Sequence, residues 1–238
     1  MTRLRACLRR NKIFFETITA ASLSIMAILV SYQSTRIASL QAQLTTLEKL
    51  PILRFDVTLE FDPTRNVYHR DTLVISNSGA AARDFESESY IFFEVKYRRD
   101  AGQSQIALVP VNGYYSASFK TKNVTGKLET KTDFAIKEGN NFKAAEIERQ
   151  FTKLTRERGV HSITRIVRYI RVTYKDIWGD RHDDVYWVDS ITTSKLEEAD
   201  GKRIVQEYGM KFTRGQFLEL DQASAGSLYE KFALMAAA

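Results

Sequence analysis

The longest apolar run of the chain lies near its N-terminus. Residues 13–32 read IFFETITAASLSIMAILVSY, and no charged residue occurs from Thr17 to Thr35. A membrane-spanning helix needs about 20 mostly apolar residues, because each residue adds about 1.5 Å to its length. The sequence therefore predicts a transmembrane helix over residues 13–33, preceded by a short tail at 1–12.

Apolar residues continue beyond this run at heptad spacing. Ile37, Leu40, Leu44 and Leu47 occupy a and d positions, and Pro51 ends the pattern. The pattern predicts a helical stalk over 34–50 and favours a homodimer in which this seam pairs two chains. The alternative is that the leucines cover an apolar patch on the domain that follows.

After the stalk the hydrophobic period changes to two. Leu53, Phe55, Val57, Leu59 and Phe61 alternate with polar residues, which is typical of a half-buried antiparallel strand. Similar segments, separated by turn-forming residues, predict strands at 68–76, 90–97, 106–111, 114–119, 134–136, 166–175 and 184–191.

Two tight turns are expected among these strands. Asn112-Gly113 is a strong signal for a two-residue hairpin turn between 106–111 and 114–119. Residues 176–180, DIWGD, predict the turn of a long hairpin between 166–175 and 184–191.

Helical periodicity returns in three places. Ala144, Ile147, Phe151 and Leu154 form one apolar face over 141–158, and Gly159 is a suitable stop. After residue 193 the pattern is helical again, with a capping box at Ser194 and Glu197. A final helix is expected from about residue 224, around residues 229–234.

Many short strands separated by turns predict a mainly β fold with helical additions. We expect an antiparallel β-sandwich domain over 51–192 that carries the helical insertion at 141–158. A C-terminal helical segment over 193–238 completes the predicted organisation.

Three short motifs carry a family resemblance: Ile37-Ala38 with Gln41, Pro51-x-Leu53, and Leu73-x-Ile75-x-Asn77-x-Gly79-x-Ala81. The layout resembles that of uncharacterised bacterial single-pass membrane proteins with a Gln-rich helical stalk and an immunoglobulin-like β-sandwich. The similarity covers roughly the first hundred residues and brings no catalytic residues. It implies a membrane-tethered, extracytoplasmic interaction domain.

The distribution of charge predicts how the helix is oriented across the membrane. The formal net charge is +6, and most of it comes from five basic residues without an acid in the tail: Arg3, Arg5, Arg9, Arg10 and Lys12. Short basic flanks stay in the cytoplasm, so we expect a plasma (inner) membrane protein with its bulk outside the cytoplasm. No small-x-small cleavage site closely follows the apolar core, which favours an uncleaved anchor over a signal peptide.

Cysteine usage restricts the chemistry outside the membrane. Cys7 is the only cysteine and lies in the tail. The predicted domain therefore lacks disulfides and cysteine-ligated metal. We expect residues 51–192 to fold without metal, and the sequence holds no cofactor-binding motif.

Acidic residues gather at the predicted hairpin turn. Asp176, Asp180, Asp183 and Asp184, together with His182, fall within nine positions. Such oxygen ligands suit a hard cation such as Ca²⁺, but the spacing is not that of an EF-hand. Asp and Gly are also ordinary turn residues, so a solvated turn is favoured over a metal site.

The sequence holds no local catalytic motif. Its three histidines are His69, His161 and His182, and neither a His-Glu-x-x-His, a Gly-x-Ser-x-Gly nor a Walker motif is present. We therefore expect no enzymatic activity. The alternative is a hydrolase whose site is assembled from distant residues near Asp176 and His182.

Basic residues recur through the predicted helix and the strand that follows it. Glutamates interleave with the start of the series, and Arg168 shares a strand face with Ile170. Pairing within the fold or solvation is therefore favoured over nucleic-acid binding, and contact with lipid headgroups is a secondary hypothesis. The series comprises Arg156, Arg158, Arg165, Arg168, Arg171 and Lys175.

The leading functional hypothesis is a single-pass, membrane-anchored envelope protein. Its partners would be the lipid bilayer and an unidentified protein or envelope component bound by the sandwich, with no nucleic acid. The first alternative is a transmembrane sensor or effector that signals through helix association. The second is the hydrolase with a nonlocal site.

Overall fold

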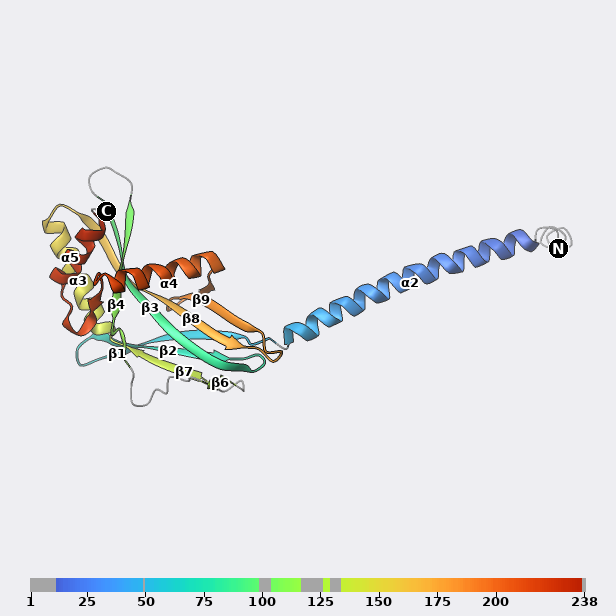
Figure 1. Ribbon diagram of the computed structural model, residues 1–238, viewed down its shortest axis with the longest axis horizontal. Helices are drawn as coiled ribbons and strands as arrows, with labels where there is room; N and C mark the ends of the chain where they lie inside the picture. The colour runs from blue at the N-terminus through green and yellow to red at the C-terminus, as the bar shows by residue number, and fades with distance from the viewer. Residues whose placement is uncertain (1–11, 49, 99–103, 117–125, 129–133, 237–238) are drawn as a thin grey trace. The chain divides into compact units, whose positions relative to one another are not determined.

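The computed structural model describes the chain except for residues 1–11, 49, 99–103, 117–125, 129–133 and 237–238 (Figure 1). Contacts divide the chain into two compact units, Met1–Lys49 and Leu50–Ala238. Helix and strand each account for 41% of the structure, and the strands form two sheets. A mixed helix and sheet fold therefore replaces the predicted mainly β class.

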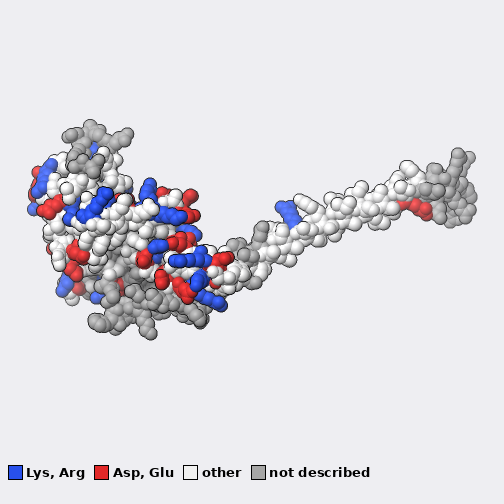
Figure 2. All heavy atoms as spheres, in the orientation of Figure 1, with Lys and Arg blue, Asp and Glu red and all other residues white. Residues whose placement is uncertain are grey.

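The N-terminal unit contains one long helix, α2 (Lys12–Glu48). Its segment Glu16–Ala42 is long and apolar enough to cross a membrane and is not buried in the protein. Figure 2 shows how few charged side chains this helix carries. The hydroxyls of Ser24 and Thr35 donate to carbonyls four residues earlier, at 2.9 Å. These two polar groups are thus satisfied inside the helix, as an apolar environment requires.

The predicted stalk is part of the same helix. α2 runs unbroken from the predicted span through almost all of the predicted stalk. Ile37 and Leu40 are exposed in the single chain. The side chains of Leu44 and Leu47 lie outside the described residues, so the proposed seam stays a prediction.

The second unit is built on a long twisted sheet with the order β10-β9-β8-β3-β4-β11. All of its pairs are antiparallel except β11 with β4. The short strand β6 (Gly126–Leu128) pairs with the start of β3. The remaining strands are β3 (Ala82–Arg98), β4 (Gln105–Asn112), β8 (His161–Lys175), β9 (Arg181–Val188), β10 (Thr193–Lys195) and β11 (Leu218–Glu219).

A smaller sheet with the order β1-β2-β7-β5 accompanies it. Its strands are β1 (Leu53–Asp62), β2 (Val67–Asn77), β7 (Phe134–Gly139) and β5 (Tyr115–Ser116), all paired antiparallel. Side chains from β1 and β2 share a core with β3, β8 and β9; Phe55, Leu73, Phe85 and Ile170 are among its members. We call this the inter-sheet core.

Helices cover the rest of the long sheet. α3 (Asn141–Glu157) packs on β8 and β2, and α5 (Ala225–Ala236) packs on α3 and β4. With side chains from β3 they form a second core, the helix core, around Phe93, Phe151 and Phe232. α4 (Glu198–Thr213) contributes Ile204 to a third cluster with Phe92 and Val167. Because Phe92 and Phe93 are successive strand residues, α4 lies on the opposite face from α3 and α5. Figure 1 shows α3 beside α5, with α4 alongside β8 and β9.

Most predicted elements are confirmed. Strands form at 53–62, 67–77, 82–98 and 134–139, and the hairpin of β8 and β9 turns at residues 176–180. α3 matches the helix predicted over 141–158. Ala144, Ile147 and Phe151 are buried, although Thr155 takes the fourth buried position in place of the half-buried Leu154.

The hairpin predicted at Asn112-Gly113 is wrong. β4 pairs with β3 in the long sheet, whereas β5 pairs with β7 in the small one. The chain therefore changes sheets at Gly113, whose φ of 73° suits a sharp corner. The change is favoured because it buries Tyr114 in the helix core.

The apolar face predicted for the first strand is buried over only half its length. Phe55 is buried, but Leu59 and Phe61 are 37% and 48% exposed. β1 is an edge strand, and its register with β2 shifts between Glu60 and Phe61. The irregularity ends the regular alternation that would have kept Phe61 on the covered face.

The capping box predicted at residues 194 and 197 is also wrong. Residues 193–195 form strand β10 on the edge of β9, and α4 begins at Glu198 with no side-chain hydrogen bond at its N-cap, Glu197. The backbone of residues 193–195 is paired with β9 and therefore cannot also form the first turn of a helix. The final helix is confirmed as α5, in which Leu228 and Phe232 are buried.

A buried ion pair lies between the inter-sheet core and the helix core. On β8, Arg168 separates Ile170 in the inter-sheet core from Ile166, which packs on the helix core. The Arg168 Nη2 is 2.6 Å from the Oδ2 of Asp71 on β2, and the two side chains are 8% and 0% exposed. The predicted pairing of Arg168 within the fold is confirmed.

A tyrosine completes this cluster. The Tyr114 hydroxyl donates to Asp71 Oδ2 at 2.9 Å and accepts from Arg168 Nη2 at 3.1 Å. Burial raises the pKa of Tyr114, so the hydroxyl keeps its proton for Asp71. Gly139 makes room for the cluster, because a Cβ there would lie 1.9 Å from Asp71 Oδ1 and 2.6 Å from the Tyr114 ring.

We expect Arg168→Met to lower the free energy of unfolding of the 50–238 unit by about 3–5 kcal/mol, because it leaves the Asp71 carboxylate buried without its counter-ion. Urea unfolding measures the change. Arg165→Met is the matched control; its partner Glu94 is at 2.9 Å but Arg165 is 48% exposed, so a loss below about 1 kcal/mol is expected.

The double variant Asp71→Leu with Arg168→Met should recover part of that loss, since no unpaired charge remains. Equal losses for Arg165→Met and Arg168→Met would show that burial of the pair has no special importance.

Candidate functional site

Asp176 organises the turn of the β8–β9 hairpin. Its Oδ1 accepts hydrogen bonds from the backbone N–H groups of Trp178 at 2.9 Å and Asp180 at 3.0 Å. Its Oδ2 lies 3.1 Å from His182 Nε2. The His182 ring stacks on Tyr174, with ring centroids 4.7 Å apart and planes at 13°.

These contacts decide how Asp176 titrates. Burial by itself would raise the pKa of Asp176, but the hydrogen bonds from His182 and from the backbone of Asp180 and Trp178 outweigh it and lower the pKa. The carboxylate is therefore ionised and committed to holding the turn closed.

Two of the other acids of this cluster have separate cationic partners, whereas Asp180 contributes its backbone N–H to Asp176. Asp183 forms two hydrogen bonds with Arg171, at 2.7 and 2.8 Å, and these lower the pKa of Asp183. Asp184 pairs with Lys195 at 2.8 Å. Among the described residues, no three His, Cys, Asp or Glu side chains are grouped so that they could hold a metal ion.

The nonlocal hydrolase hypothesis requires a nucleophile beside His182. An orienting carboxylate is present, because Asp176 holds the imidazole. A hydroxyl or thiol hydrogen-bonded to that ring is missing from the part of the chain that the structure describes. Two members of a triad, His182 and Asp176, are thus in contact, but Asp176 also closes the turn.

A pocket of about 700 Å³ opens beside this turn, between β9, β10 and α4. Its walls include both His182 and the charged pairs described above, together with Lys202 and Glu198 from α4. Because acids and bases alternate around it and pair with each other, the pocket has no dominant charge.

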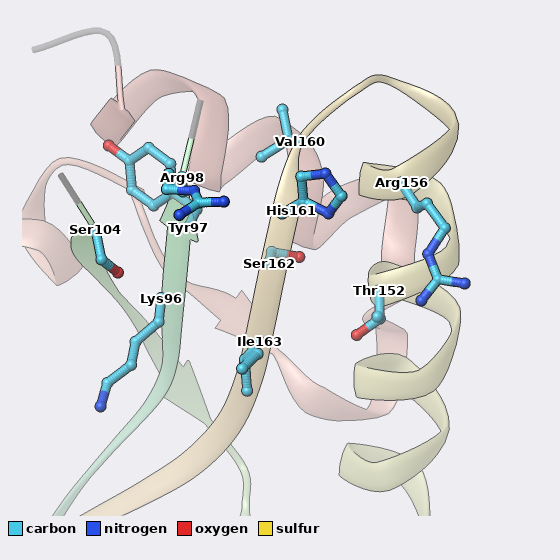
Figure 3. Close-up of a pocket in the computed structure, with 10 residues that line it drawn as sticks. All are labelled: Lys96, Tyr97, Arg98, Ser104, Thr152, Arg156, Val160, His161, Ser162 and Ile163. Atoms are coloured by element: carbon cyan, nitrogen blue, oxygen red, sulfur yellow. The ribbon is translucent and has the colours of Figure 1, made fainter. Parts of the chain in front are cut away.

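A second pocket, of about 480 Å³, has a different character (Figure 3). It lies where the end of β3, the start of β8 and the last turns of α3 meet. Its basic lining residues are Lys96, Arg98, Arg156 and His161, and none of the described residues that line it is acidic. We call it the basic pocket.

Sequence reasoning missed the basic pocket. Arg156 belongs to the basic series in the sequence, and His161 is one of the three histidines, but no motif links them to each other or to Lys96 and Arg98. Arg98 and His161 are 63 positions apart and become cross-strand neighbours through the pairing of β3 with β8. No local sequence signal marks such a contact.

The other members of the basic series are paired, as predicted. Arg165 contacts Glu94, Arg171 contacts Asp183, and Lys175 contacts Asp84 at 2.8 Å. The Arg158 guanidinium lies 4.0 Å from the centroid of the Tyr229 ring, a cation–π contact.

The comparisons with known proteins assign no family. No protein-family model matches the chain, and no curated protein has a significant match to it. The likeness to bacterial membrane proteins with an immunoglobulin-like sandwich therefore remains a resemblance, and function must be argued from the chain itself.

One further titratable group lies near the buried ion pair. Burial raises the pKa of Glu148 on α3 to about 7, although a hydrogen bond from the Ile166 backbone and attraction to Arg168 oppose the shift. In the unfolded chain this carboxyl titrates at its ordinary value of 4.5. Between these values the folded state binds more protons, so stability falls as the pH rises.

We expect Glu148→Gln to raise the free energy of unfolding at pH 8 by about 2 kcal/mol while changing it little at pH 4, where the carboxyl is mostly protonated in both states. Urea unfolding at the two pH values measures this. Glu146→Gln on the same helix is the control and should show no such difference. A gain of equal size at both pH values would exclude the titration of Glu148 as its cause.

Proposed function

We propose that the chain is a single-pass, membrane-anchored envelope protein whose 50–238 unit binds another protein or an envelope component outside the cytoplasm. The apolar, unburied segment Glu16–Ala42 carries this proposal. Exposing so many apolar side chains to water would be unfavourable, whereas a bilayer accommodates them.

The basic tail supports the proposed direction and membrane. Five Lys or Arg residues precede the apolar run, whereas Arg36 is the one basic residue between Gln33 and Leu47 on its other side. This asymmetry keeps the N-terminus in the cytoplasm. We assign the anchor to the plasma (inner) membrane, with the bulk of the chain on its outer side.

We further propose that the two sheets form an immunoglobulin-like antiparallel sandwich. The shared inter-sheet core and the antiparallel pairing within the small sheet support this. In such a sandwich the loops and edges surround a rigid core and are free to contact a partner.

Binding is favoured over catalysis by the state of the charged residues. At the hairpin turn Asp176 is engaged with His182, Asp183 with Arg171, and Asp184 with Lys195. Pockets lined by polar side chains remain, and these suit recognition of a partner.

A sensor or effector that signals through helix association is the second candidate. The continuity of α2 from the span into the stalk favours it, because a change in helix pairing inside the membrane would be transmitted along a rigid rod. Ile37, Leu40, Leu44 and Leu47 would form the homodimer seam.

We expect a phosphatase fused after Ala238 to be active and a fluorescent protein fused there to be dark, because the C-terminus would be exported. Enzyme assay and whole-cell fluorescence measure the two. Replacing the five basic tail residues with serine should weaken the orientation in both assays. An inactive phosphatase together with a bright fluorescent fusion would reverse the topology.

We also expect cysteines placed at Leu47, in a Cys7→Ser background, to crosslink two chains in membranes. Leu40→Asn with Leu44→Asn should abolish the crosslink, because buried amides without partners cost about 1–3 kcal/mol each. Ser39→Asn, outside the a and d positions, is the control. No crosslink from any position between 37 and 50 would leave a monomeric tether.

A further inference from the structure

The basic pocket contains cationic side chains that the fold does not neutralise. Elsewhere on β8, Arg165, Arg168 and Arg171 each contact a carboxylate. In contrast, neither Arg98 nor Arg156 pairs with any acid that the structure describes, and both are exposed. Lys96 of the same pocket lies 3.8 Å from Glu94, so the unpaired cations are the two arginines. Two guanidinium groups left unpaired beside so many paired ones point to a charge supplied from outside the protein.

Strand register places an imidazole beside one of these arginines. Arg98 on β3 lies directly opposite His161 on β8, and side chains of opposite residues on one sheet face start about 5 Å apart. Figure 3 shows the His161 ring between the side chains of Arg98 and Arg156. An anion placed among these side chains would be attracted by the guanidinium groups of both Arg98 and Arg156.

The hydroxyl groups of the pocket are mostly occupied. Thr152 donates to the Glu148 carbonyl at 3.0 Å. Thr155 donates to the Phe151 carbonyl, so the 2.7 Å contact between Thr155 and Ser162 uses the Ser162 proton. The donors left for a ligand are therefore mainly the charged side chains, which favours a fully ionised ligand over a neutral one.

An apolar strip lies beside the cations. Lys96 on β3 is flanked by Ile106 on β4 and by Ile163 on β8 in the strand register. These two isoleucines are 58% and 72% exposed. Ile163 also lines the basic pocket, so the strip continues from the place where an anion would sit.

We propose that the basic pocket binds a phosphate group and that Ile106 and Ile163 contact an apolar group attached to that phosphate. Arginine matches phosphate through paired N–H donors, and the negative charge of a phosphate suits the two guanidinium groups of Arg98 and Arg156. The imidazole of His161 adds an N–H donor. The volume of about 480 Å³ is that of an ordinary small-ligand site. The proposal deepens the proposed function, on which it rests, by naming the ligand chemistry.

Calorimetric titration of the full chain in nonionic detergent tests the site with inorganic phosphate and phenyl phosphate. Phenyl phosphate should bind more tightly. Arg98→Gln and Arg156→Gln should each weaken both probes about tenfold. Ile163→Ser should remove the advantage of phenyl phosphate while leaving inorganic phosphate unchanged. All three sites are exposed, and an unchanged urea midpoint confirms folding.

Arg203→Gln on α4 is the control of equal charge change; Arg203 is 72% exposed and pairs with Asp200. It should leave both affinities unchanged. Absence of binding, or an equal loss for Arg203→Gln and Arg98→Gln, would overturn the proposal, the latter because net charge alone would explain it. Equal affinities for the two probes in the unmodified chain would overturn the role of the isoleucines.

Nanodiscs distinguish a lipid headgroup from a dissolved phosphate ester as the source. If a lipid occupies the pocket, phenyl phosphate should bind more weakly in phosphatidylglycerol nanodiscs than in phosphatidylcholine ones, and Arg98→Gln should abolish that difference. Equal binding in both supports a dissolved ester at the same site. An inverted topology in the fusion assay would change the compartment and leave these titrations unaltered.

Discussion

The buried pair of Arg168 and Asp71 is the contact on which the arrangement of the 50–238 unit depends. It joins β8 of the long sheet to β2 of the small one at the point where the inter-sheet core gives way to the helix core. Burial makes the pair costly to form and more costly to break on one side. Gly139 and Tyr114 fit around it, so register, sheet change and helix position are fixed together.

The same strand shows how the protein manages positive charge. On β8, Arg165, Arg168 and Arg171 recur every third residue, and they contact carboxylates from β2, β3 and β9. Because its charges are paired, β8 can pack against both the small sheet and the helices. This pairing does not extend to the start of β8, where His161 lies opposite Arg98, and neither Arg98 nor Arg156 contacts an acid that the structure describes. The basic pocket thus contains two arginines that no described acid neutralises.

The membrane anchor and the basic pocket are both consistent with the proposed function at a membrane surface. A helix apolar enough to cross a membrane would hold the 50–238 unit close to a bilayer surface, where the local concentration of any surface-bound partner is high. A site for a phosphate attached to an apolar group suits that setting, because such molecules are enriched at membranes.

Local patterns in the sequence were sufficient for the helices and most strands. The period of seven and the apolar run gave α2, and alternation gave β1 to β3, because these signals depend on neighbours in the chain. The hairpin predicted at Asn112-Gly113 was wrong because burial of Tyr114 in the helix core decided where the chain turned. The predicted burial of Leu59 and Phe61 was wrong because β1 lies at the edge of its sheet. Pairing of Arg168 followed from its strand face, but its partner Asp71, 97 positions away, was decided only by tertiary structure. The basic pocket likewise depends on a register between distant strands, since electrostatic contact is set by distance in space and not along the chain.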